Sequence, residues 1–94
     1  MAKRQRKLQE KMLKAKFMVE VKTDRNTLVE KTQHVTDLRT GEWWTDEQIS
    51  KRGISTFQNF DDVIETLNWN LNGDTSQTIT RWTSPCTAEI YIFD

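Results

Sequence analysis

Apolar and polar residues alternate along residues 17–23, and this alternation predicts a β-strand. Phe17, Val19 and Val21 would share one side of that strand, so we expect this side to face a hydrophobic core. A similar but less regular pattern continues over residues 27–38. The first half of the chain therefore predicts an antiparallel meander.

Two short turn sequences divide this meander. Residues 24–26 and 39–41 combine Asp, Asn, Thr and Gly, which are typical of turns. We expect further strand segments over residues 27–31, 33–38 and 42–44. A sheet of three antiparallel strands is the simplest assembly of these segments.

Two helices are predicted next. Thr45 can act as an N-cap with Gln48 three residues later, so a short helix is expected over about residues 46–52. Asn59 can cap a second helix over about residues 60–71, whose apolar residues fall on one face at 100° per residue. These apolar residues are Phe60, Val63, Ile64, Leu67 and Leu71.

The end of the chain predicts two more strands. Gly73 suits the left-handed position just beyond a helix end, so the second helix should stop there. Strands are then expected over residues 78–83 and 87–93, joined through Ser84 and Pro85. No internal repeat or long linker divides the chain.

Together these elements predict an α+β fold in a single small domain, residues 17–94. Its core would be a mainly antiparallel sheet of four to five strands, with the helix over about 60–71 packed on one face and the short helix over about 46–52 beside it. One Pro and three Gly among 94 residues indicate an ordered chain rather than a low-complexity one.

Charge is distributed very unevenly along the chain. Residues 1–16 hold seven Lys or Arg and one acid, Glu10, and so carry about +6; the other residues hold seven cations and thirteen acids, about −6. The segment over about residues 3–16 consists of good helix formers and predicts a basic helical arm in front of the domain.

Such an arm can lie along a phosphate backbone and release counterions. The residues expected to contact nucleic acid are Lys3, Arg4, Arg6, Lys7, Lys11 and Lys14. Lysine outnumbers arginine in the arm, which favours point-charge contacts over recognition of particular bases. Two alternatives stay open: the arm could enter an acidic groove of a protein, or it could be a solvated helix that aids solubility.

A protein-binding surface is predicted on the helix over about 60–71. Asp62, Glu65 and Trp69 lie opposite its apolar stripe and could bind a cation through ionic and cation–π contacts. The alternative is a solvated acidic face with Trp69 covered by a strand or loop. Trp43 and Trp44 are adjacent in an expected strand, so one should enter the core while the other, taken as Trp43, points outward. The outward tryptophan either marks an interface or is covered by the short helix that begins after Thr45.

The remaining composition excludes several classes of site. One cysteine, Cys86, and one histidine, His34, allow neither an internal disulfide nor a Cys/His zinc site. No phosphate-binding loop, nucleophile elbow or metal-spaced cluster is present, so we expect no cofactor, no metal and no enzymatic activity. No apolar run is long enough to cross a membrane. We expect a cytoplasmic protein.

The predicted order of a helix, three strands and a helix is similar to that of a double-stranded-RNA-binding domain. In that family the second helix begins with lysines that contact phosphates, whereas the helix here begins with Asp61, Asp62 and Glu65. The similarity is one of topology alone.

Two functional hypotheses follow. The first is a non-enzymatic binding protein whose basic arm contacts nucleic acid, or a nucleoprotein complex, without strong sequence specificity, while the acidic body contacts a protein. The second is a small protein-interaction module, an inhibitor or assembly adaptor of the type that viruses encode to act on host machinery, which binds one protein and no nucleic acid. Contact between the arm of one copy and the acidic helix of another would give a homodimer.

Overall fold

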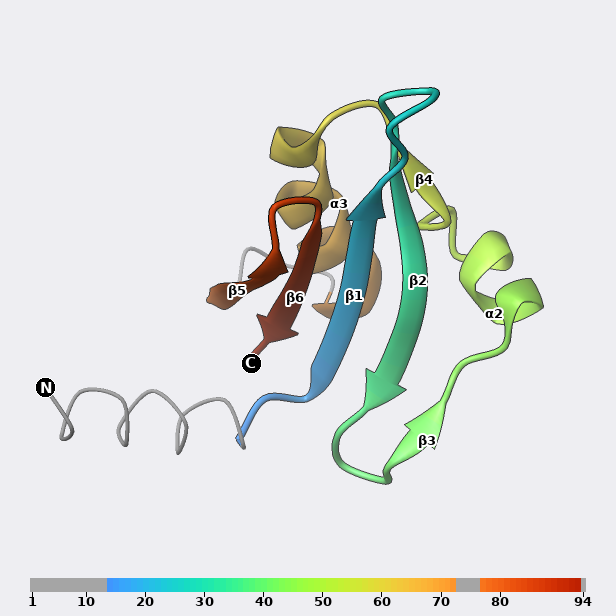
Figure 1. The fold of residues 1–94 in the computed structure, drawn as a ribbon. Coiled ribbons are helices and arrows are strands. Elements are labelled where there is room, and N and C mark those ends of the chain that lie inside the picture. Colours follow the sequence, from blue (N-terminus) through green and yellow to red (C-terminus); the bar gives the residue numbers. More distant parts are fainter. Residues whose placement is uncertain (1–13, 73–76, 94) are drawn as a thin grey trace, which may run out of the picture.

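The computed structural model describes residues 14–72 and 77–93. In this part of the chain, six strands and two helices form an α+β fold (Figure 1). The elements, in chain order, are β1 (Phe17–Thr23), β2 (Glu30–Asp37), β3 (Glu42–Trp43), α2 (Asp46–Lys51), β4 (Thr56–Phe57), α3 (Phe60–Asn72), β5 (Thr78–Ser84) and β6 (Thr87–Ile92).

The strands form one antiparallel sheet in the order β3-β2-β1-β6-β5, with β4 paired to the start of β2. β1 is central and pairs along its length with both β2 and β6. The predicted α+β class and antiparallel pairing are confirmed, but the sheet has six strands rather than four to five. The strand missed is β4, because two residues are too few to show a period.

The core lies between the sheet and α3, which runs behind the strands in Figure 1. Val19 of β1 is paired with Val35 of β2 and Ile90 of β6, and all three side chains are fully buried. Val63 and Leu67 of α3 are fully buried against this face of the sheet. The apolar face predicted for this helix therefore meets the apolar face predicted for β1.

The opposite face of the sheet carries no helix in the described part of the chain; we call it the open face (Figure 1). Side chains alternate along strands, so the neighbours of the buried residues point to this face. By register they include Met18, Glu20 and Lys22 of β1, Lys31, His34 and Thr36 of β2, Trp43 of β3, Ile79 and Arg81 of β5, and Glu89 and Tyr91 of β6.

The helix starts follow the predicted capping. Thr45 and Gln48 form a complete capping box, in which the Thr45 hydroxyl accepts from the Gln48 N–H and the Gln48 side chain accepts from the Thr45 N–H. At the start of α3 the Asn59 side-chain oxygen accepts the Asp62 N–H at 3.1 Å. The predicted stop at Gly73 lies outside the described residues.

Two predicted boundaries are wrong in the described residues. Residues 27–29 belong to the β1–β2 turn rather than to a strand, since the Leu28 N–H donates to the Asp24 carbonyl and the Asp24 N–H to the Val29 carbonyl. Residues 14–16 are not helical. Instead, the Lys16 N–H donates to the Ile92 carbonyl and its carbonyl accepts the Leu38 N–H, both at 2.8 Å. Pairing with the sheet has replaced the local helix preference there; residues 3–13 of the predicted arm lie outside the described residues.

Candidate anion-binding hollow

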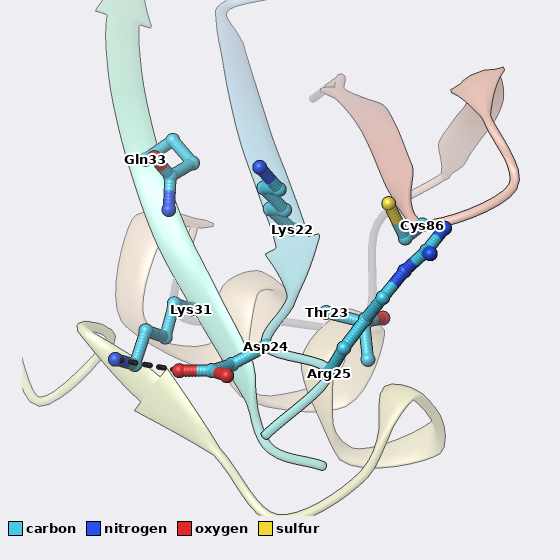
Figure 2. A pocket seen from close by; sticks show the side chains of 7 residues that line it. All are labelled: Lys22, Thr23, Asp24, Arg25, Lys31, Gln33 and Cys86. Carbon is cyan, nitrogen blue, oxygen red and sulfur yellow. Dashed lines mark ion pairs between the residues drawn. The ribbon is translucent and has the colours of Figure 1, made fainter. Parts of the chain in front are cut away.

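A hollow of about 570 Å³ lies at the end of the open face where the β1–β2 turn approaches the β5–β6 turn (Figure 2). We call it the hairpin hollow. It is lined by Lys22, Thr23, Asp24, Arg25, Lys31, Gln33 and Cys86. Three of these side chains are cations and one is an acid, so the hollow carries an excess of about two positive charges.

The positive charge is concentrated by the strand register. Lys22 of β1 is directly opposite Lys31 of β2, and like charges in that position repel. A β-bulge next to Gln33 produces this pairing, because Glu20 pairs with His34 whereas Val21 pairs with Thr32. Two lysines held face to face in a hollow are an arrangement that a bound anion would stabilise.

Asp24 neutralises only one of the cations. Its Oδ2 lies 3.1 Å from the Lys31 Nζ, while its Oδ1 accepts the backbone N–H of Asn26 at 2.8 Å. The Asn26 N–H and then the Lys31 ammonium hold the pKa of Asp24 below its ordinary value. The carboxylate therefore stays ionised at neutral pH and fixes the turn that carries Arg25.

The far wall of the hollow is formed by Cys86. The Thr23 N–H donates to the Cys86 carbonyl at 2.8 Å, which joins the β5–β6 turn to the end of β1. The Ser84 hydroxyl, and after it the Arg25 guanidinium, lower the pKa of the Cys86 thiol. Figure 2 shows the Arg25 side chain extending toward Cys86. Arg25 thus favours negative charge at this wall.

A second hollow, of about 350 Å³, lies beside α2 and is also cationic. Its lining is Phe17, Asp37, Arg39, Trp44, Gln48, Lys51 and Arg52. Its guanidinium groups are engaged within the protein. The Arg39 group lies 5.0 Å from the Phe17 ring centre and is paired with Asp37 at 3.0 Å, and the Arg52 group lies 5.1 Å from the Trp44 ring centre. The hairpin hollow is therefore the better candidate for a ligand.

The two hollows account for nearly all the positive charge of the body. Residues 17–94 contain seven Lys or Arg, and six of them line one hollow or the other; the seventh is Arg81. Only two of the thirteen acids, Asp24 and Asp37, do so. An acidic body that gathers its cations in this way has local sites for anions despite its net charge.

The sequence-predicted nucleic-acid residues are mostly outside the described part of the chain. Of the six, only Lys14 is described, and it is exposed. The other five are Lys3, Arg4, Arg6, Lys7 and Lys11. The hairpin hollow was not predicted, since its lysines meet only through the register of two strands and a bulge. The sequence feature that could have indicated the hollow is the presence of three cations within residues 22–31.

The predicted protein-binding residues fall on two different layers. Asp62, Glu65 and Trp69 are exposed on α3, and 62% of Trp69 is accessible, so the alternative of a covered Trp69 is wrong. Trp43 lies on the open face and is 69% exposed, whereas Trp44 packs against the core. The expectation that only one of the adjacent tryptophans enters the core is confirmed.

Two kinds of feature are missing from residues 14–72 and 77–93. No group of three or more His, Cys, Asp or Glu side chains is placed to hold a metal ion there. Within the same residues no helix is both long and apolar enough to cross a membrane. Comparison with known proteins finds no family model, no curated protein and no solved structure that matches this chain.

Proposed function

We propose that the protein is a non-enzymatic nucleic-acid-binding protein, in which the basic arm and the hairpin hollow contact phosphates of one ligand. The observation that supports this function is the direct opposition of Lys22 and Lys31, with Arg25 beside them. Phosphate groups would relieve the repulsion between the two lysines and release counterions. The remaining cations come from Lys3, Arg4, Arg6, Lys7, Lys11 and Lys14.

The distance between Lys22 and the point where the arm joins the body indicates the size of the proposed ligand. The arm joins the body at the start of β1, whereas Lys22 lies near its end. Five residues of strand span ~17 Å, which is about five base pairs along a duplex. A polymeric ligand can span this distance, which is longer than a single nucleotide or a free phosphate.

Binding is expected to depend on charge far more than on base sequence. Lysine supplies most of the cations, and lysine acts as a point charge rather than as a bidentate donor to a base edge. The exposed face of α3, with Asp62, Glu65 and Trp69, is left for a protein partner, because its acids would repel phosphates.

The test is a salt titration of the affinity for a 20-base-pair duplex and for a 20-nucleotide single strand. Contact with five to eight phosphates predicts a slope of about −4 to −7 for log affinity against log salt on the duplex. Replacing Lys22 and Lys31 by Gln should reduce the slope by about 2, since two phosphate contacts are lost. Replacing Lys51 and Arg52 by Gln removes the same amount of charge but should leave the slope nearly unchanged.

The full-length protein also permits a footprint, because Cys86 is its one thiol. A bound strand should slow alkylation of Cys86 in the hairpin hollow. If the protein retains neither nucleic acid at about 50 mM salt, this function is rejected.

A second candidate is a protein-interaction module, which is favoured by the 62% exposure of Trp69 beside Asp62 and Glu65. Exposed tryptophan is frequent in binding hot spots. Affinity capture from a native lysate, with and without nuclease, separates the two functions. Capture that survives nuclease and is lost in Trp69→Ala supports the second candidate. If the partner is another copy, Glu65→Lys should dissociate a salt-sensitive dimer in light scattering.

A further inference from the structure

The open face carries an aromatic platform near its β3 edge. The ring centres of Trp43 and His34 are 4.2 Å apart, with an angle of 51° between the ring planes. The His34 ring of β2 thus lies against the indole, and 69% of Trp43 remains accessible. A flat, supported and accessible indole is the kind of surface on which nucleic-acid bases stack.

This platform is aligned with the hairpin hollow along β2. His34 and Lys31 both belong to the open face although they are three residues apart, because the bulge at Gln33 changes the alternation between them. Three residues of strand separate them by ~10 Å. Lys31 and the His34 ring that contacts Trp43 thus follow one another along β2, with Lys22 opposite Lys31 on β1 and Trp43 on the neighbouring β3.

Acidic residues at the centre of the open face limit where a nucleic-acid strand could lie. Glu20 of β1 lies opposite both His34 on β2 and Glu89 on β6, so two carboxylates face each other at the centre of the open face. They repel a phosphate backbone that would cross β1 toward β6. The charge pattern therefore favours a ligand that lies over β2, β3 and the Lys22 end of β1.

We propose that β2, β3 and the Lys22 end of β1 bind single-stranded nucleic acid on the open face, with phosphates at Lys22 and Lys31 and an unpaired base stacked on Trp43. This inference rests on the proposed function and narrows its ligand. In a duplex the bases are stacked on one another and their faces are inaccessible to Trp43, whereas a single strand presents them.

The test compares four probes on the full-length protein at fixed salt: 12-nucleotide oligo-dT, 12-nucleotide oligo-rU, an abasic 12-mer with the same number of phosphates, and a 12-base-pair duplex. Trp43→Ala is the main variant. Trp69→Ala is the matched control, because Trp69 is similarly exposed but lies on α3. Trp43→Phe retains a ring, and circular dichroism checks that each variant is folded.

We expect both single strands to bind more tightly than the abasic strand, and Trp43→Ala to weaken their binding by roughly 5- to 150-fold. Trp43→Phe should recover much of this loss. The affinity of Trp69→Ala for the single strands should differ from that of the wild type by less than about twofold. The affinity of every variant for the abasic strand should also stay within about twofold of the wild type. A preference for rU over dT, or the reverse, would assign the ligand to RNA or to DNA.

Equal affinity for the base-containing and abasic strands, or no effect of Trp43→Ala, overturns the stacking inference while leaving phosphate binding in place. Tighter binding of the duplex than of the single strands also overturns it. Failure of all four probes to bind rejects the proposed function itself, so the two failures are distinguishable.

Discussion

Asp24 combines two properties that have opposite effects on an anionic ligand. Its carboxylate fixes the β1–β2 turn by accepting the Asn26 N–H, and its other oxygen pairs with Lys31 at 3.1 Å. The turn holds Arg25 in place, but the negative charge competes with any phosphate for Lys31. An asparagine would keep the acceptor of the turn and remove the competing charge.

We therefore predict that Asp24→Asn raises the affinity for nucleic acid by about 2- to 5-fold, the range expected for one exposed ion pair. Equilibrium binding at about 50 mM salt measures the change. Asp61→Asn, which removes a charge from the start of α3, serves as the control and should have a smaller effect. A weaker affinity in a folded Asp24→Asn protein would contradict a role for the hollow in binding anions.

The same carboxylate gives stability a defined dependence on pH. The pKa of Asp24 is lower in the folded protein than in the unfolded chain. Its contribution to stability is therefore present above the unfolded value and is lost as the pH falls through the folded value. Urea titrations from pH 7 to pH 3 should show a smaller acid-dependent loss in Asp24→Asn than in the wild type.

At the scale of single elements, the bulge in β2 decides which side chains lie together in the candidate site. A regular strand places only every second residue on one face, so Lys31 and His34 could not both lie on the open face without an extra residue. Gln33 is that residue. It also leaves Glu30 directed inward, where its carboxylate accepts a hydrogen bond from the Thr23 hydroxyl at 2.6 Å.

Deletion of Gln33 is predicted to destabilise the protein by several kcal/mol. Restoring regular alternation would turn Lys31 toward the core or move the start of β2 out of register, and an unpaired buried charge is costly. Urea unfolding followed by circular dichroism measures the loss. Gln33→Ala keeps the residue count and should change the free energy of unfolding by less than about 1 kcal/mol, since the residue is exposed.

The elements that were predicted well are those that depend on residues close together in the sequence. Thr45 with Gln48, and Asn59 before an apolar stripe, fix the starts of both helices through contacts three residues apart. The hollow and the platform depend on contacts between distant residues, such as Lys22 with Lys31 and Trp43 with Thr36. Register across strands is set by turns and a bulge that the alternation of residue types does not specify.

At the scale of the whole molecule, the boundary between arm and body lies closer to the N-terminus than the charge pattern predicts. The run of basic residues ends at Lys16, but Ala15 is 4% exposed and Lys16 is hydrogen-bonded to Ile92 of β6 and to Leu38, just beyond β2. Composition separates the arm from the body by charge, whereas packing assigns residues 15 and 16 to the body.

Two truncations test this boundary. Removing residues 1–13 should leave the free energy of unfolding within about 1 kcal/mol of the wild type, because the described core is formed by residues 15–93. Removing residues 1–16 should cost about 2–4 kcal/mol, from two lost hydrogen bonds and the burial of Ala15. Urea unfolding of the two proteins measures the difference. Equal stability of the two would contradict the packing assigned to Ala15 and Lys16.

The position of β1 also has a consequence for biosynthesis. Among the strands of the described residues β1 is translated first, yet one of its two neighbours is β6, the last of them. At about 5–20 residues per second, a ribosome leaves that side of β1 unpaired for several seconds. The nascent chain can form the β1–β2 hairpin early, but β1 gains its second neighbour only after Ile92 has been synthesised. Until then the unpaired edge is a natural substrate for chaperones.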